Sequence, residues 1–205
     1  METSRSEYEF CRKILDNYDK YNNSLKNYQA CNHDRSKERE LFERPTTDKL
    51  NAIRLFCDEG NAKYQNNEIE EAILEYKNAL IYVDYTFPED KTLEEEYNKL
   101  ITRIHLNLSA CFLKINEFNM VILHCNNVLK NDPNNVKALY RLAQAYINIY
   151  EHKKAIEIIN NVLSSNNDDK SAFIKLRNDI ILIENKYKNS NSEKYKGLFN
   201  KKPNC

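Results

Sequence analysis

An internal repeat constrains the fold of this 205-residue chain more than any other feature. Three segments with the same order of small and apolar residues begin at Ile53, Thr102 and Val136. Because small side chains let two antiparallel helices approach closely, each segment is predicted to form one helix pair. The small or β-branched residues at the eighth and twentieth positions of the segments are Gly60, Ser109 and Ala143, and Ala72, Val121 and Ala155.

The first two repeats are separated by a longer interval than the last two. We call the spacing from Ile53 to Thr102 the long interval and that from Thr102 to Val136 the short interval. The long interval contains an insertion of about 15 residues. It falls in residues 82–99, where Pro88 is a breaker and Thr92 with Glu95 forms a capping-box pattern. We therefore expect it to lengthen the second helix of the first repeat and the first helix of the second.

Composition and periodicity together predict an all-α fold. Only 2 Gly and 4 Pro occur in the chain, whereas sandwiches and barrels need many turns that use them. The short interval equals the period of the tetratricopeptide repeat, so three helix-turn-helix repeats are expected to stack into a right-handed α-solenoid. The expected helices span 49–66, 69–85, 93–115, 118–131, 136–149 and 153–164, followed by one at about 170–187.

The predicted organisation has four parts. The segment at 1–45 either packs on the repeat array or is loose, and the basic stretch at 194–202 either continues the last helix or is a solvated tail. Both alternatives are open from the sequence. The parts are a helical appendage at 1–45, three repeat motifs within 46–167 (about 53–86, 102–135 and 136–169), a capping helix at 168–190 and a basic tail at 191–205.

Composition also argues against several function classes. Charge is balanced, with 31 Lys and Arg against 31 Asp and Glu, which does not favour a nucleic-acid-binding face. No Cys-x-x-Cys pair, secretory signal or long apolar run is found, so a reducing, cytoplasmic compartment without a membrane span is expected. The 4 His lack zinc-ligand spacing, and no phosphate-binding loop or nucleophile elbow occurs. We expect no enzyme, no metal and no cofactor.

Several short segments resemble the tetratricopeptide domains of co-chaperones, especially the C-terminal domains of large FK506-binding immunophilins. The resemblance covers about residues 49 to 199, and the insertion falls where those immunophilins are also long. The segment that precedes it is too short for an isomerase domain, so the resemblance implies an interaction module. The segments are Cys-Asp-Glu-Gly-Asn at 57–61, Glu-Glu-Ala-Ile at 70–73, His-Leu-Asn-Leu-Ser-Ala-Cys at 105–111, Lys-Ala-Leu-Tyr-Arg at 137–141 and Tyr-Lys-Gly-Leu-Phe at 195–199.

This resemblance implies a clamp for two carboxylates at the end of a peptide. Four of the family's five clamp positions are matched, and we call Asn61, Asn107, Lys137 and Arg141 the clamp residues. The position of the first family lysine holds Cys57. The implied partner is the acidic Glu-Glu-Val-Asp tail of heat-shock protein 90 or 70, and the implied function is that of a co-chaperone adaptor.

The clamp residues suit a carboxylate on physical grounds as well. Lys137 and Arg141 are four residues apart and therefore share one helix face. Asn61 and Asn107 lie on the equivalent helices of the first two repeats, which line the inner surface when an array coils. Cations and amide donors that converge on one surface fit a terminal carboxylate and an acidic side chain, because hydrogen bonds to charged groups contribute roughly 1.5–3 kcal/mol each.

Cys57 leaves the choice of ligand open. A neutral thiol cannot pair with a carboxylate, so either Arg54, one turn earlier, reaches the ligand or the site takes different C-terminal peptides. Tyr64, Ala110 and Lys114 match further ligand-contacting positions of the family, although Tyr64 equally suits packing between helices and Lys114 equally suits plain solvated surface. A structural scaffold without a clamp is the other alternative. Salt dependence distinguishes the clamp from the scaffold, because binding of an acidic tail weakens as ionic strength rises and an apolar scaffold contact does not.

Overall fold

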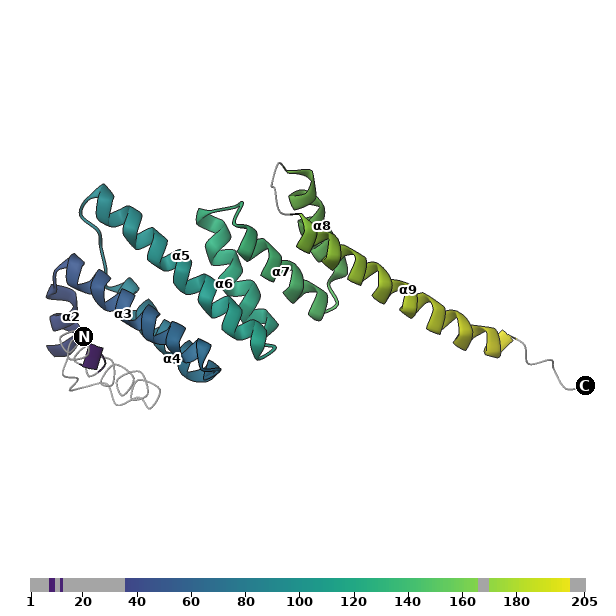
Figure 1. The fold of residues 1–205 in the computed structure, drawn as a ribbon, viewed down its shortest axis with the longest axis horizontal. Coiled ribbons are helices and arrows are strands. Elements are labelled where there is room, and N and C mark those ends of the chain that lie inside the picture. Colours follow the sequence, from purple (N-terminus) through teal and green to yellow (C-terminus); the bar gives the residue numbers. More distant parts are fainter. Residues whose placement is uncertain (1–7, 10–11, 13–35, 166–169, 200–205) are drawn as a thin grey trace, which may run out of the picture.

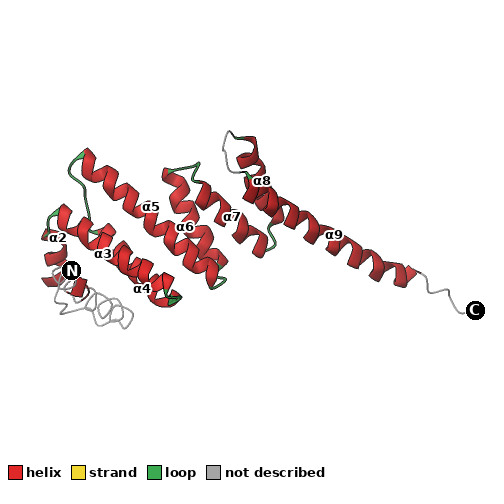
Figure 2. Cartoon of the chain, in the orientation of Figure 1, coloured by secondary structure: helices red, strands yellow, loops and turns green. Residues whose placement is uncertain are grey.

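The computed structural model describes residues 8–9, 12, 36–165 and 170–199, and the regular structure in these ranges is entirely helical (Figures 1 and 2). The all-α prediction is confirmed. None of the described helices is both long enough and apolar enough to cross a membrane. The helices are α2 (Ser36–Glu43), α3 (Thr46–Gln65), α4 (Ile69–Asp84), α5 (Lys91–Lys114), α6 (Phe118–Asn131), α7 (Val136–Asn148), α8 (His152–Ser164) and α9 (Ser171–Phe199).

Six of these helices form three pairs that stack in a row (Figure 1). The pairs are α3 with α4, α5 with α6 and α7 with α8, and α4 packs on α5 as α6 packs on α7. Among the first helices of the three pairs, α5 contacts both α3 and α7. We call the surface that they form the inner-helix face. Side chains from all three repeats therefore reach one surface.

The loop inside each helix pair repeats the same backbone conformation. Asn67, Asn116 and Tyr150 have positive φ angles of 64°, 60° and 63°. They are separated by the same long and short intervals as the repeat starts. In each loop the next residue donates its backbone N–H over 2.9 Å to the carbonyl five residues earlier. Glycine usually provides this left-handed turn at the end of a helix, and asparagine tolerates it, so a chain with 2 Gly can still end its helices in this way.

The small residues predicted at the helix crossings are all buried. Gly60 of α3 leaves no room for a larger side chain without a shift of its neighbour, since a Cβ atom built there lies 2.7 Å from Cε1 of Tyr76 on α4. Ser109 and Ala143 occupy the same repeat position in the later pairs and are also fully buried. Close approach at this position therefore sets the packing within each pair.

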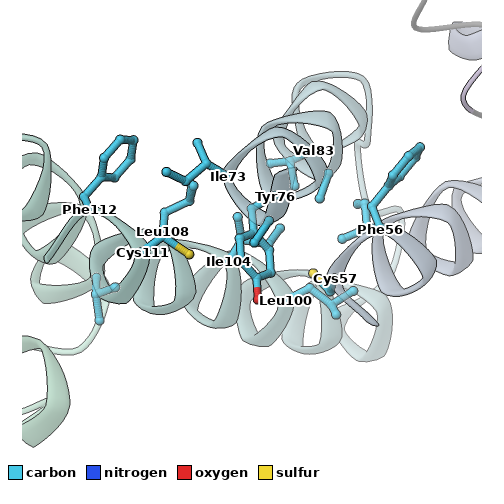
Figure 3. Close-up of a cluster of buried hydrophobic side chains, with 14 of the residues drawn as sticks. Phe56, Cys57, Ile73, Tyr76, Val83, Leu100, Ile104, Leu108, Cys111 and Phe112 are labelled. Atoms are coloured by element: carbon cyan, nitrogen blue, oxygen red, sulfur yellow. The ribbon is translucent and has the colours of Figure 1, made fainter. Parts of the chain in front are cut away.

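The apolar core has two parts. The larger one runs from Leu41 of α2 to α7, and Figure 3 shows its centre between α3, α4 and α5. The second joins α7 and α8 to α9, where Phe173 and Ile180 are buried and Tyr140 packs edge-on against Phe173 with ring centroids 5.6 Å apart. Fully burying such a side chain stabilises the fold by about 1.5–3 kcal/mol. Through these contacts α9 covers the last repeat, and it extends to Phe199, farther than the expected range of 168–190.

The described parts of the N-terminal segment pack on the first repeat. Lys49 of α3 is buried, and its Nζ donates to the carbonyls of Phe42 (2.7 Å) and Tyr85 (3.0 Å), so it joins the end of α2 to the end of α4. Burial lowers the pKa of this ammonium group. The ring of Tyr8 packs on that of Phe56 at 5.3 Å between centroids. Residues 1–7, 10–11 and 13–35 of the N-terminal segment, and residues 200–205 of the tail, lie outside the described residues.

Candidate functional site

The two clamp asparagines are joined directly across the inner-helix face. Nδ2 of Asn107 on α5 donates to Oδ1 of Asn61 on α3 over 2.9 Å. The same oxygen accepts a hydrogen bond from the Tyr76 hydroxyl of α4 at 2.8 Å. Both asparagines are half-buried. Because these two bonds use only the oxygen of Asn61, its amide is oriented while its Nδ2 donors are left out of both bonds.

Arg141 connects the third repeat to the second. Its Nη1 donates to the backbone carbonyl of Leu106 (2.6 Å) and to Oγ of Ser109 (3.2 Å), both on α5. These acceptors are neutral, so they hold the guanidinium in place without pairing its positive charge with an acid. Guanidinium carries five N–H donors, and the bonds above take only those of Nη1. Lys137 is exposed four residues earlier on the same helix.

The further candidates from the family resemblance lie at the same face. Nζ of Lys114 on α5 sits 4.2 Å from the centroid of the Tyr64 ring on α3 and 3.4 Å from Oδ1 of Asn67. This contact holds the ends of α3 and α5 together, with a cation over an aromatic face. Ala110 is half-buried on α5, between Asn107 and Lys114 in the sequence.

Cys57 does not lie at the surface. Its side chain is 0% exposed, and it belongs to the buried cluster in which Figure 3 also labels Leu100 and Tyr76. Burial raises the pKa of the Cys57 thiol to about 12, although the positive charge of Arg103 acts in the opposite direction. The thiol is therefore neutral and packed as a small apolar group. With Cys111 and Cys125 it is one of three free, buried thiols among the described residues.

Arg54 is engaged elsewhere. It forms an ion pair with Glu96 near the start of α5 and donates a hydrogen bond to Oδ1 of Asn51. The sequence suggested that Arg54 could reach a ligand in place of the missing lysine. The structure instead gives it a carboxylate partner from its own chain.

Two side chains at this face were missed from the sequence. Tyr76 orients Asn61, as described above, although it belongs to the outer helix α4. Arg103 of α5 forms an ion pair with Asp58 of α3, with Nη2 and Oδ1 2.6 Å apart. A signal for Arg103 was present, since it stands one short interval before Lys137 and therefore at the same repeat position.

The half-buried His105 of α5 and the buried His124 of α6 form a pair between the two helices of the second repeat. Nδ1 of His105 and Nδ1 of His124 are 3.0 Å apart, and His124 stacks on Phe112. Burial, with a contribution from His105 and Lys77, lowers the pKa of His124 to about 4. In the part of the chain that is described, no group of three or more His, Cys, Asp or Glu side chains is placed to hold a metal ion.

Comparison with protein families identifies the repeat. A family model described as tetratricopeptide repeat matches residues 122–180. The chain is 27% identical over 140 residues to mouse peptidyl-prolyl cis-trans isomerase FKBP4, covering 68% of this chain and 31% of that protein. It is 31% identical over 144 residues to Arabidopsis thaliana peptidyl-prolyl cis-trans isomerase PASTICCINO1, covering 70% of this chain and 23% of that protein. The chain thus spans about a third or less of the length of these relatives.

Solved structures give a similar result over a larger share of their length. The C-terminal tetratricopeptide-containing domain of a Plasmodium falciparum FK506-binding protein superposes with a TM-score of 0.62 at 30% identity, covering 74% of this chain and 99% of that domain. The Saccharomyces cerevisiae Hsp90 co-chaperone Cns1 superposes with a TM-score of 0.64 at 18% identity, covering 73% of this chain and 45% of that protein. The second match supports the fold alone.

Proposed function

Since this chain belongs to the tetratricopeptide-repeat family that includes the C-terminal domain of an FK506-binding protein, we propose that it is a non-catalytic adaptor for acidic C-terminal peptides. The proposed ligand is the Glu-Glu-Val-Asp tail of heat-shock protein 90 or 70. The proposed binding surface is the inner-helix face, with Asn61, Asn107, Lys137 and Arg141 as its carboxylate-binding residues. A co-chaperone of this kind would act in the cytoplasm.

The geometry of the clamp residues carries this proposal. Asn61 and Asn107 share a hydrogen bond, and Arg141 is anchored to the same helix as Asn107 through Leu106 and Ser109. Amide and guanidinium donors from three repeats are therefore held in place before any ligand arrives. Pre-organised donors bind a carboxylate more tightly because less side-chain entropy is lost on binding.

Calorimetric titration of the whole chain with the peptide Met-Glu-Glu-Val-Asp tests the proposal. We expect a micromolar dissociation constant at low salt that weakens markedly at moderate salt, because the contacts are between charges at an exposed surface. Lys137→Ala should weaken binding by about tenfold, the effect of one charged contact.

Lys77→Ala is the matched control, since it removes one positive charge from an exposed position of the outer helix α4. Its affinity should equal that of the unmodified chain. Absence of binding to the peptide, or binding that is equally strong at both salt concentrations, would contradict the proposal. The scaffold interpretation would then be preferred.

A further inference from the structure

The three repeats place a cation at the same position of their first helices. Arg54, Arg103 and Lys137 are the second residues of the segments that begin at 53, 102 and 136. Arg103 is thus the structural equivalent of Lys137, one repeat earlier, and both lie four residues before a clamp residue. Side chains four apart on a helix share a face, so Arg103 is directed to the surface that carries Asn107.

Contacts between α3 and α5 place Arg103 beside the position that lacks a lysine. Asp58, which pairs with Arg103 at 2.6 Å, directly follows Cys57. One turn further along both helices, Asn61 and Asn107 are hydrogen-bonded. The two contacts join residues 45 and 46 positions apart, as expected of two helices running in the same direction. The charge of Arg103 also reaches the buried thiol of Cys57, as its effect on the pKa of that group indicates.

We propose that Arg103 supplies the cation that Cys57 does not, by binding a carboxylate of the acidic C-terminal peptide, and that Asp58 occupies Arg103 while no peptide is bound. This inference rests on the function proposed above. Asp58 is the repeat equivalent of Asn107 and Arg141, since the same long and short intervals separate the three. The first repeat therefore holds a carboxylate where the other two hold donors.

The Arg103–Asp58 pair is suited to being opened by a ligand. The side chains are 41% and 65% exposed, and exposed ion pairs of this kind contribute about 0–1 kcal/mol. An incoming carboxylate that also reaches the Asn61 amide would accept hydrogen bonds from both Asn61 and Arg103, whereas Asp58 accepts one from Arg103. Guanidinium has five donors in a planar fork, so Arg103 can bind the peptide after releasing Asp58 or while sharing it. In either case Asp58 competes with the ligand and lowers the affinity.

Titration of the Met-Glu-Glu-Val-Asp peptide into Arg103→Ala, Asp58→Asn and the double variant tests this inference. We expect Arg103→Ala to weaken binding by about tenfold, the effect of one charged contact. Arg103→Lys should retain a larger part of the affinity, because it keeps the charge but loses the fork. Asp58→Asn should strengthen binding severalfold, and this gain should shrink in the double variant because it depends on Arg103.

Thermal unfolding of the same variants separates ligand binding from a structural role. If Arg103→Ala lowers the unfolding temperature but leaves the peptide affinity equal to that of the Lys77→Ala control, Arg103 serves only to pair with Asp58 and the inference is overturned. If Lys137→Ala still weakens binding in the peptide titration in that case, the proposed function stands without Arg103. Failure of the unmodified chain to bind the peptide would overturn both.

Discussion

The contact between the first and second repeats differs from that between the second and third. Between α3 and α5, the first seam, both arginines face carboxylates of the chain itself: Arg54 pairs with Glu96, and Arg103 pairs with Asp58. Between α5 and α7, the second seam, Arg141 is held by neutral oxygens of Leu106 and Ser109. Within the described residues, Lys137 and Arg141 form no ion pair. The two arginines of the first seam are thus paired with acids, whereas Lys137 and Arg141 at the second seam are not.

This difference suggests that the two seams of the inner-helix face contribute different contacts to a ligand. A carboxylate ligand gains most at the second seam, where no internal acid has to be displaced. At the first seam it finds the amides of Asn61 and Asn107 already oriented, but Arg54 and Arg103 are paired with acids of the chain itself. The repeats therefore share a fold and position their side chains equivalently, yet they differ in the charge that they offer to a ligand.

Replacing one arginine of each seam by alanine should show the largest difference between the two seams. We expect Arg141→Ala at the second seam to weaken binding of the Met-Glu-Glu-Val-Asp peptide by about 1.5–3 kcal/mol, which is roughly tenfold to a hundredfold. Arg54→Ala at the first seam should change it less than about twofold, because Arg54 lies two turns before Asn61 on α3 and is bound to Glu96 and Asn51. Calorimetry measures both. A larger loss for Arg54→Ala would restore the idea that Arg54 replaces the missing lysine.

Acid should lower the stability of the second repeat, which contributes α5 to both seams. His124 is only 6% exposed and packs against His105, and burial lowers the pKa values of both imidazoles. Their Nδ1 atoms are 3.0 Å apart, so one ring must accept the hydrogen bond in its neutral form. Between these pKa values the imidazoles are protonated in the unfolded chain but neutral in the folded chain. The free energy of unfolding therefore falls as pH drops below the ordinary histidine pKa of about 6.5 towards 4.

The expected loss from this histidine pair is about 2 kcal/mol between about pH 7 and pH 5. Urea unfolding at several pH values measures it, and His124→Gln should flatten the dependence. An unchanged urea midpoint across this range would show that the imidazoles are not held neutral by burial.

Enlarging Gly60 tests whether close helix packing supports the first seam. A methyl group there meets the ring of Tyr76 at 2.7 Å, and this ring is buried and bound through its hydroxyl to Asn61. Overpacking costs about 1–3 kcal/mol, and the better helix propensity of alanine offsets about 0.5–1 kcal/mol of it. We expect Gly60→Ala to destabilise the protein by about 1–2 kcal/mol in urea unfolding. A stabilised variant would show that the ring moves away freely.

The smallest expected effect lies in the loop of the third repeat. Tyr150 has φ 63° and is 79% exposed, whereas asparagine occupies the same loop position in the other two repeats. Tyr150→Asn should raise stability by about 0.5–1 kcal/mol, because asparagine tolerates this conformation better and no buried contact is lost. A lower unfolding temperature would show that the contact of the Tyr150 ring with His152, 6.2 Å between centroids, matters more than backbone strain.

The helix pairs could be predicted from the sequence because the repeat fixes them by local and periodic signals. Gly60 and its equivalents marked the crossings, and the long and short intervals recur in the loops at Asn67, Asn116 and Tyr150. The start of α6 at Phe118 and its end at Asn131 were both expected. The contacts of Tyr8 and Phe42 with the first repeat were not, since they depend on packing between segments distant in sequence.

The candidate site was predicted less completely. The family resemblance selected Asn61, Asn107, Lys137 and Arg141, but it did not reveal that Arg54 pairs with Glu96, which depends on how α3 packs against α5. The burial of Cys57 was visible in the sequence, because Ile53, Phe56, Cys57 and Gly60 follow the three- and four-residue steps of one buried helix face. Arg103 is not one of the family's clamp positions, although its repeat equivalence to Lys137 is visible in the spacing.

A comparison of two peptides tests the central claim most directly. The chain is titrated with Met-Glu-Glu-Val-Asp carrying a free C-terminal carboxylate, and with the same peptide amidated at that end. If the clamp residues bind the end of the chain, the free acid binds with micromolar affinity and the amide loses about tenfold or more, because a charged hydrogen-bond acceptor is gone. Equal affinity for both peptides would show that the inner-helix face does not recognise a C-terminal carboxylate, and would contradict this account.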